Sequence, residues 1–453
     1  MERIRAVVLA AGKGKRMQSD LPKVLHRLCG RPLVLYVLDA LAGAVAAPPL
    51  VVVGYGAEAV RGVVGDRGVC VDQGEPRGTG HAVQQAWPHL GEGDEPVLIA
   101  YGDTPLLRAE TIRALLEVHR TTRAAATMLT AALDDPTGYG RVVRGPDGAV
   151  QRIVEEADAS PEEARLREIN AGTYVFERRA LAAALAALSP ANAQGEYYLT
   201  DTIAWLLRDG QRVSALLAPA EEAMGVNSRR ELAACEAVMR RRLLDALMDA
   251  GVTIVDPAST YVHAGVRVGQ DTVIHPQSYL EGQTTVGRQC VIGPQARLLD
   301  ATLGDRVTVE VSTVAGSEIG DGSRIGPYSR LRPTSRLGRF VEVGNFAEIK
   351  NATIGDYTKV HHMSYIGDAH LGVRVNIGAG TVTCNFDGRR KHRTVIEDEA
   401  FIGSDTMLIA PVRIGRGAVT GAGAVVKKDV PPGGVAVGVP ARVIKHVSAD
   451  VAR

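Results

Sequence analysis

The sequence predicts an α/β Rossmann-like domain, a connecting α-helix and a left-handed parallel β-helix of hexapeptide repeats, in that order. Three observations predict this architecture. Apolar residues recur every six positions in the second half, Leu gives way to Val and Ile near residue 250, and a buried strand runs into a glycine loop at the start. With 453 residues, the chain has room for two or three domains that each bury a core.

Composition argues against several classes of partner. The formal net charge is +1, and Phe, Trp and Tyr number only 5, 2 and 12, which argues against a nucleic-acid binder that stacks bases. The five cysteines are scattered and form no CxxC pair, so the sequence predicts neither a disulfide framework nor a zinc site of that type. This cysteine usage favours a reducing, cytoplasmic setting.

No segment reads as a membrane span. The apolar run at residues 6–11 is too short for a signal peptide. The most span-like segment, residues 33–53, is interrupted by Asp39, Gly43 and the pair Pro48-Pro49. We therefore expect a helix, a loop and a buried strand in that segment, and no membrane partner.

The first domain opens with a strand predicted at residues 5–11, which enters the loop GKGKR at residues 12–16. A glycine loop after a strand lets backbone N–H groups approach a phosphate, and Lys13, Arg16 and Lys23 supply positive charge beside it. The spacing of the glycines fits neither a Walker A motif nor a dinucleotide-binding GxGxxG. The loop thus predicts phosphate binding without naming the ligand.

A helix is predicted at residues 228–250, between domains at residues 1–227 and 251–453. Ser228 and Glu231 form a capping box, apolar residues then recur with helical spacing, and Gly251 supplies a stop. Residues 1–250 contain 30 Leu against 31 Val plus Ile, whereas residues 251–453 contain 8 against 44. This swing toward β-branched side chains predicts a second domain made almost entirely of strands.

The second domain repeats with a period of six. Three runs of aliphatic residues keep this spacing: Val262, Val268, Ile274, Leu280, Val286, Ile292 and Leu298; Ile319, Ile325, Leu331, Leu337, Val343 and Ile349; Ile396, Ile402, Leu408 and Ile414. Such a period is typical of a parallel β-helix, in which three repeats form one triangular coil and the aliphatic residues stack inside. A β-sandwich would alternate with a period of two. We expect glycine to turn the corners of the coils.

Irregularities interrupt the repeat. Steps of five residues at 298–303, 349–354 and 366–371 indicate register adjustments. Residues 384–394 read CNFDGRRKHRT and contain no repeat at all. Function concentrates in loops that leave a regular scaffold, so this insertion is a candidate functional segment.

Several motifs together resemble one enzyme family. The segment LAAGKGKRMQSDLPKVLH at residues 9–26 resembles the signature of nucleotide-sugar pyrophosphorylases. GTGHA at 78–82, YGDTP at 101–105, EINAGTYVF at 168–176 and GVNSR at 225–229 follow in that family's order. With the hexapeptide domain behind it, the chain is similar over nearly its whole length to bifunctional UDP-N-acetylglucosamine pyrophosphorylase / glucosamine-1-phosphate N-acetyltransferases.

The resemblance implies two reactions for cell-envelope synthesis. The β-helix would acetylate glucosamine 1-phosphate from acetyl-CoA, and the α/β domain, a nucleotidyltransferase, would then join the product to UMP from UTP. A sugar 1-phosphate is already anionic, so it needs positioning and charge neutralisation rather than a general base. The resemblance also implies Mg²⁺ as a cofactor and a homotrimer whose acetyl-transfer site is built between subunits.

For the first domain, the resemblance assigns Asp103 and Asn227 as Mg²⁺ ligands, and Lys23 and Arg16 as the cations that stabilise charge on the triphosphate. It also implies a set of residues that contact UTP or the UDP-sugar: Leu9, Ala10, Ala11, Gly12, Lys23, Gln73, Gly78, Thr79, Tyr101, Gly102, Asp103, Gly140, Glu155, Asn170 and Asn227.

For the second domain, the resemblance assigns His362 as the general base, because imidazole titrates near neutrality. Glucosamine 1-phosphate would contact Arg332, Lys350, Tyr365 and Asn376, and Glu348 would orient neighbouring groups. Acetyl-CoA would contact Ala379, whose backbone is also the oxyanion donor, and a further set of residues: Asn385, Phe386, Lys391, Ser404 and Ala422.

Other interpretations stay open at this point. Asp103 precedes Thr-Pro and could be a turn residue, Asn227 could cap a helix, and His81 could be structural. His361, His362 and His370 could form a zinc site. For the whole chain, the alternatives are a single-activity pyrophosphorylase that uses the β-helix as an oligomerisation scaffold, and a non-catalytic module resembling an exchange factor.

The sequence departs from the family at three places. Lys15 stands where the family usually has threonine, and Phe386 replaces a tyrosine. Residues 436–440 lack an arginine that some members use for the phosphates of CoA, and Arg442 or Lys445 could replace it.

Overall fold

A computed structural model describes residues 4–45 and 47–446 of the chain. The chain divides into two compact units, residues 1–239 and 240–453. The division falls inside helix α7 (Arg229–Asp249), in the segment where the sequence predicts a helix. The first half of α7 therefore belongs to the first unit and the second half to the second.

The first unit is built on one mixed β-sheet. Its main strands lie in the order β11, β7, β10, β6, β1, β4 and β5, and all neighbouring pairs are parallel except the two that involve β10. A hairpin of β8 and β9 adds to β10. The bounds are β1 Arg5–Leu9, β4 Leu50–Val53, β5 Val69–Asp72, β6 Val97–Tyr101, β7 Ala126–Ala132, β8 Arg141–Arg144, β9 Val150–Val154, β10 Glu168–Phe176 and β11 Val213–Leu217.

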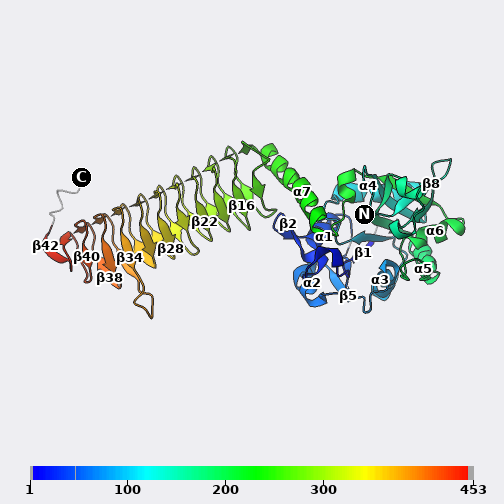
Figure 1. Ribbon diagram of the computed structural model, residues 1–453, viewed down its shortest axis with the longest axis horizontal. Helices are drawn as coiled ribbons and strands as arrows, with labels where there is room; N and C mark the ends of the chain where they lie inside the picture. The colour runs from blue at the N-terminus through cyan, green and yellow to red at the C-terminus, as the bar shows by residue number, and fades with distance from the viewer. Residues whose placement is uncertain (1–3, 46, 447–453) are drawn as a thin grey trace. The chain divides into compact units, whose positions relative to one another are not determined.

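Both faces of this sheet are covered. Val7 and Val8 are neighbours on β1 yet belong to different apolar clusters, and Val51 and Val52 on β4 divide in the same way. Strands that are buried on both faces read as continuous apolar runs, as LVVV of β4 does. The helices around the sheet (Figure 1) are α1 Leu33–Ala42, α2 Ala57–Val64, α3 Thr79–Ala86, α4 Ala109–Thr122, α5 Arg178–Ala186 and α6 Asp201–Arg208.

The span-like segment folds as the sequence predicts. Residues 33–53 form helix α1, a loop and the buried strand β4. In the part of the chain that the structure describes, no helix is both long and apolar enough to cross a membrane.

The central strands set the place of the first site. β1 and β6 are adjacent and parallel, so the glycine loop after β1 and the segment after β6 leave the sheet at the same edge. In open α/β sheets, ligands bind at the carboxyl ends of the parallel strands.

The second unit is a parallel β-helix, as the six-residue period predicts. Short strands stack into three sheets that run along the coils (Figure 1), and their pairs are parallel except for β42, which pairs antiparallel with β41. The first coil holds β12 Thr253–Ile254, β13 Tyr261–Val262 and β14 Arg267–Val268, and the last strands are β41 Gly434–Val437 and β42 Arg442–His446. Of the apolar run from Val262 to Leu298, all but Val268 are buried.

The strands used below lie in the later coils. They are β25 Arg330–Leu331, β27 Glu342–Val343, β28 Glu348–Lys350, β30 Lys359–Val360, β31 Tyr365–Gly367, β32 Ala369–Leu371, β33 Asn376–Ile377, β34 Val382–Cys384, β35 Thr394–Ile396, β36 Phe401–Ile402, β37 Met407–Ile409 and β39 Val419–Thr420. Of the insertion predicted at residues 384–394, residues 385–393 form the loop between β34 and β35, and Cys384 and Thr394 belong to these strands.

Glycine serves the coils in two ways. It turns some of the corners, as expected, at positive φ; Gly282, Gly316 and Gly322 are examples. Many corners are turned by other residues at positive φ; one line of corners has Gln277, Gln295, Val311, Tyr328, Phe346 and Met363. Gly320 and Gly355 are not at positive φ, but a Cβ on either would lie 2.6 Å from backbone of the next coil. At these positions the coils approach so closely that only glycine fits.

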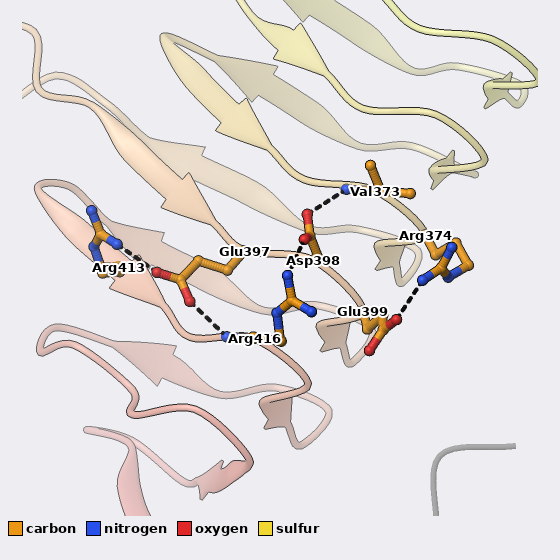
Figure 2. A network of polar contacts seen from close by, with 7 residues as sticks. All are labelled: Val373, Arg374, Glu397, Asp398, Glu399, Arg413 and Arg416. Carbon is orange, nitrogen blue, oxygen red and sulfur yellow. Dashed lines mark hydrogen bonds and ion pairs between the residues drawn. The ribbon is translucent and has the colours of Figure 1, made fainter. Parts of the chain in front are cut away.

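Charged side chains tie neighbouring coils together at another corner. Figure 2 shows Asp398, which accepts a hydrogen bond of 2.9 Å from Val373 N–H in the preceding coil and pairs with Arg416 at 2.6 Å. Glu397 pairs with Arg413 in the following coil, and Glu399 pairs with Arg374 in the preceding coil.

Candidate active sites

Lys23 packs against the glycine loop and fixes its shape. Gly14 has φ +70°, and a Cβ there would lie 2.8 Å from Lys23 Cβ, so both conformation and space require glycine. Gly12 has nothing within 4 Å of the place that a Cβ would take. The loop therefore presents open backbone at Gly12 and carries a lysine against its other glycine.

Lys23, Asp103 and Asn227 converge on one point. Lys23 follows the glycine loop, Asp103 follows β6, and Asn227 precedes α7. Lys23 Nζ forms an ion pair with Asp103 Oδ2 and donates a hydrogen bond of 2.9 Å to Asn227 Oδ1. The side chains of Lys23 and Asp103 are only 16% and 14% exposed. The fold thus brings together three groups from distant parts of the sequence.

The predicted capping box explains why the Asn227 side chain can face the cleft. Glu231 N–H donates to Ser228 Oγ at 3.3 Å, and Asn227 N–H donates to Glu231 Oε2 at 2.8 Å. Ser228 and Glu231 thus cap α7. The side-chain oxygen of Asn227 accepts from Lys23, so the alternative of Asn227 as the capping side chain is wrong.

These three groups lie in a cleft of about 790 Å³. Gly102 is the one residue of the predicted UTP and UDP-sugar set that does not line it; Gly102 N–H donates to Leu9 O behind the cleft wall at 2.9 Å. The predicted residues that do line it are Leu9, Ala10, Ala11, Gly12, Arg16, Lys23, Gln73, Gly78, Thr79, Tyr101, Asp103, Gly140, Glu155, Asn170 and Asn227.

Hydrogen bonds hold the wall of the cleft at Gln73, Gly78 and Thr79. Gln73 Nε2 donates to Gly78 O at 3.0 Å, and Thr79 Oγ1 accepts from Leu199 N–H at 3.0 Å. Gly78 has φ +107°, and a Cβ there would lie 2.6 Å from Tyr197 O. These contacts fix this part of the backbone before any ligand binds.

The wall of the cleft also has buried polar groups. Thr200 Oγ1 donates to Glu155 Oε1 at 2.8 Å, and burial raises the pKa of Glu155. Asn170 Nδ2 donates to Tyr174 Oη at 2.6 Å, and Asn170 Oδ1 accepts from Gly172 N–H at 3.1 Å. Together they form a rigid polar wall that suits the hydroxyl groups of a sugar.

Sequence reasoning missed further lining residues. Gln194, Glu196 and Tyr198 come from the loop before α6, and Tyr139 and Glu156 come from the ends of the β8–β9 hairpin. Tyr198 Oη is buried without a hydrogen-bond partner in the described part of the chain, and burial raises its pKa to about 12. The loop at 190–198 has no periodic pattern, so only its polar composition could have drawn attention.

The second candidate site follows one corner of the β-helix. Residues of successive coils pair along this sheet: Glu342 with Lys359, Lys359 with Asn376, Asn376 with Phe401, and Phe401 with Val419. Three residues after each of these paired positions, the same register stacks a line of corner residues: Asn345, His362, Ala379, Ser404 and Ala422. The predicted base thus lies in line with three residues predicted for acetyl-CoA.

Asn345 is a contact that sequence reasoning did not find. His362 Nδ1 lies 2.7 Å from Asn345 Oδ1. Since an amide oxygen only accepts, Nδ1 carries the hydrogen and Nε2 keeps its lone pair. Glu348, expected to orient neighbouring groups, pairs with Arg332 at 3.0 Å. The tautomer of His362 that this contact selects can accept a proton.

Positive charge gathers on the sheet that follows this corner. Arg332, Lys350 and Gly367 occupy corresponding positions in adjacent coils, and Tyr365 faces outward one strand above Glu348. The neighbouring Lys391 ammonium lowers the pKa of Lys350, and Arg332 adds to the effect. An excess of cations on adjacent coils suits a phosphate. Asn376 lies on β33, on the other side of the same corner.

The inserted loop reaches the same sheet, and Figure 1 shows it projecting from the coils. Asn385 Nδ2 donates to Asp368 Oδ2 at 2.5 Å and to Tyr365 Oη at 3.5 Å. Phe386 and Lys391 form an antiparallel bridge that closes the loop, and the Phe386 side chain is exposed. Asp387 accepts from two backbone N–H groups and from His392, which lowers its pKa to about 2.

The histidines of the alternative zinc site do not converge. His361 Nε2 lies 3.2 Å from Glu342 Oε2, His362 contacts Asn345, and His370 lies on β32 in a different sheet. No group of three potential metal-binding His, Cys, Asp or Glu side chains occurs within residues 4–45 and 47–446. His81, the other histidine in question, lies 3.1 Å from Gln85 Nε2 and does not line the cleft.

Three family models match successive parts of the chain. Residues 6–249 match the MobA-like NTP transferase domain, residues 259–354 the GMPPB C-terminal domain, and residues 393–428 the bacterial transferase hexapeptide repeat. These matches agree with the predicted order of an α/β nucleotidyltransferase domain and a left-handed hexapeptide β-helix.

Curated relatives match almost end to end. The bifunctional protein GlmU of Heliobacterium modesticaldum is 52% identical over 438 residues, which cover 96% of both chains. The bifunctional protein GlmU of Pelotomaculum thermopropionicum is 54% identical over 90% of both chains. That of Geobacillus sp. strain WCH70 is 48% identical over 94% of this chain and 93% of the relative. The resemblance inferred from the motifs is confirmed, and the chain belongs to the bifunctional GlmU family.

Proposed function

We propose that the chain makes UDP-N-acetylglucosamine by two successive transfers. The amino group of glucosamine 1-phosphate takes the acetyl group of acetyl-CoA, and the phosphate of the product then attacks the α-phosphorus of UTP and releases pyrophosphate. Membership in a bifunctional family supports both activities and does not favour the scaffold alternative. We assign uridylyl transfer to residues 1–227 and acetyl transfer to residues 251–453, with residues 228–250 as the connecting helix.

The convergence of Lys23, Asp103 and Asn227 carries the assignment of the first site. Attack by an anionic phosphate needs alignment and cations rather than a base. Lys23 and Arg16 provide those cations, and the open backbone at Gly12 leaves room for phosphate oxygens. Gln73, Gly78 and Thr79 bind uracil and ribose, and Gly140, Glu155 and Asn170 hold the acetylated sugar.

The donor set of Asp103 and Asn227 fits Mg²⁺. Both oxygens already face one cation, the Lys23 ammonium. One carboxylate and one amide oxygen, with phosphates and water in the remaining positions, form the kind of ligand set that Mg²⁺ accepts in phosphoryl-transfer enzymes. When bound, Mg²⁺ neutralises charge on the phosphate oxygens.

At the second site, His362 Nε2 takes a proton from the substrate ammonium, and the free amine attacks the thioester carbonyl to form a tetrahedral oxyanion. When the C–S bond of this intermediate breaks, the second proton that the nitrogen loses passes to the CoA sulfur, which leaves as the thiol. Arg332 and Lys350 bind the sugar phosphate, while Tyr365 and Asn376 hold the sugar. Ala379 N–H has no hydrogen-bond acceptor among the residues described and can stabilise the oxyanion. Acetyl-CoA lies along Asn385, Phe386, Lys391, Ser404 and Ala422.

We infer that the working assembly is a homotrimer. Tyr328, Phe346 and Met363 form a line at the corner position next to Asn345 and His362, and they are 59%, 55% and 67% exposed. The rings of Tyr328 and Phe346 stack at 5.4 Å. A continuous exposed apolar line beside a candidate site is typical of a surface that another chain covers. A sedimenting monomer with full acetyltransferase activity would contradict this inference.

We place the reactions in the cytoplasm. Cys70, Cys290 and Cys384 carry thiols rather than disulfides. Such cysteines are typical of a reducing compartment.

The two-site assignment is tested by separating the half-reactions. We expect His362→Ala to lose acetyl transfer by about 10²- to 10⁴-fold and to keep uridylyl transfer, and Asp103→Ala to do the reverse. Each half-reaction is assayed with acetyl-CoA and glucosamine 1-phosphate, or with UTP and N-acetylglucosamine 1-phosphate. Loss of both activities in either variant, with an unchanged unfolding temperature, would contradict the assignment.

A further inference from the structure

We propose that Lys23 guards the metal position of the nucleotide-free enzyme. Its ammonium occupies the oxygens of Asp103 and Asn227, so a divalent cation must displace the lysine before it can bind both. This inference rests on the proposed role of these two residues as Mg²⁺ ligands.

The contacts of Lys23 carry the proposal. The ammonium pairs with Asp103 Oδ2 and donates to Asn227 Oδ1 at 2.9 Å, so one cation already uses both proposed ligand oxygens. The pair is mostly buried, with side-chain exposures of 16% and 14%. A carboxylate with so little solvent needs a positive partner, and the lysine supplies one when no metal is bound.

The same burial decides when the lysine can leave. An ammonium that loses its partners inside a cleft is destabilised unless another anion receives it. The stem of Lys23 lies against Gly14, with Cγ and Cδ 3.2 and 3.3 Å from where a glycine Cβ would be. Rotation about the end of this stem can carry Nζ from Asp103 toward a phosphate held by the glycine loop. A triphosphate therefore releases the metal ligands by taking the lysine.

Metal and nucleotide then bind cooperatively. A cation alone competes with Lys23, whereas a cation that arrives with the triphosphate replaces the lysine while the lysine gains a phosphate. Coupling of this kind is reciprocal, because each ligand improves the binding of the other by the same factor. The free enzyme thereby keeps its buried carboxylate neutralised and takes up metal together with substrate.

The test measures binding of Mn²⁺ alone to the nucleotide-free, full-length protein, by the electron paramagnetic resonance signal of the free ion. A lysine that holds the two oxygens for about nine-tenths of the time weakens cation binding about tenfold. We therefore expect Lys23→Met to bind Mn²⁺ about tenfold more tightly than the unchanged protein. Lys23→Gln, which also removes the charge, serves if the Met variant does not fold.

Arg16→Met is the matched control. Arg16 lines the same cleft, so its replacement removes one positive charge without releasing the oxygens of Asp103 and Asn227. We expect a smaller gain than with Lys23→Met. Equal gains in Mn²⁺ affinity in the two variants would show that only the overall charge matters and would overturn the proposed role of Lys23.

Asp103→Ala separates this inference from the assignment beneath it. Combined with Lys23→Met, it should abolish the gain in Mn²⁺ binding. If this double variant still bound Mn²⁺ as tightly as Lys23→Met does, both the metal assignment and the proposed role of Lys23 would be overturned. If Asp103→Ala weakens Mn²⁺ binding but Lys23→Met leaves Mn²⁺ binding at the level of the unchanged protein, the metal assignment stands and the proposed role of Lys23 is wrong.

Discussion

Replacing Asn345 with Ala should slow acetyl transfer without weakening substrate binding. Asn345 Oδ1 lies 2.7 Å from His362 Nδ1 and keeps the hydrogen on that nitrogen. A hydrogen bond between neutral groups contributes about 0.5–1.5 kcal/mol, and each 1.36 kcal/mol is about a factor of ten in rate. We therefore expect kcat for acetyl transfer to fall about 2- to 13-fold, with KM for glucosamine 1-phosphate and the rate of uridylyl transfer unchanged.

The assay follows release of the CoA thiol over a range of substrate concentrations. Asn345→Asp keeps an acceptor for Nδ1–H and should retain more activity than the Ala variant. Gln295→Ala is the matched control, because it removes a side-chain hydrogen bond of 2.9 Å to Gln277 at a corner of earlier coils. Full activity of Asn345→Ala, or a rise in KM at constant kcat, would refute the role of Asn345 in positioning His362.

Two further changes test the first site and the coils. Burial raises the pKa of Glu155, so the folded state binds the proton of this carboxyl group more tightly than the unfolded state does. The folded state therefore loses stability as the pH rises from the ordinary pKa of a carboxyl group to the raised pKa of Glu155. Glu155→Gln should therefore melt at a higher temperature than the unchanged protein at pH 7–8 but not at pH 4, and KM for N-acetylglucosamine 1-phosphate should rise about tenfold. Gly320→Ala places a Cβ 2.6 Å from Gly338 and should lower the free energy of unfolding, measured with denaturant, by about 1–3 kcal/mol. The control, Gly62→Ala, lies in open space on α2 and should raise the free energy of unfolding by about 0.5–1 kcal/mol. Equal effects at the two glycines would contradict the close approach of the coils.

The β-helix could be predicted almost completely because its core repeats along the chain. Each aliphatic residue of a hexapeptide fills the same place in its coil, so the period alone locates Ile274, Leu280 and their equivalents in the core. The need for glycine at places where two coils touch could not be predicted in this way. Gly320 and Gly355 are required by the backbone of the next coil, and that distance is a property of the stacked structure.

At the first site, too, the place of some residues could be predicted from the sequence and that of others could not. The glycine loop and the segment after β6 follow strands with clear apolar runs, so their place at one sheet edge could be inferred. Tyr198 and Glu196 enter the cleft from an irregular loop before α6, and nothing periodic ties that loop to the sheet edge. Their position depends on tertiary packing, which local sequence patterns do not encode.

Asn345 shows what could have been inferred and was not. It precedes His362 by 17 residues, which is the length of that coil, so counting back one coil from the predicted base finds its contact. The count must follow the irregularities of the repeat, however. A coil of 18 residues would place Glu397 after Ala379, whereas the coil that holds the inserted loop has 25 residues and places Ser404 there. The insertion therefore does more than supply Asn385 and Lys391: its length determines that Ser404 lies above Ala379, in line with His362.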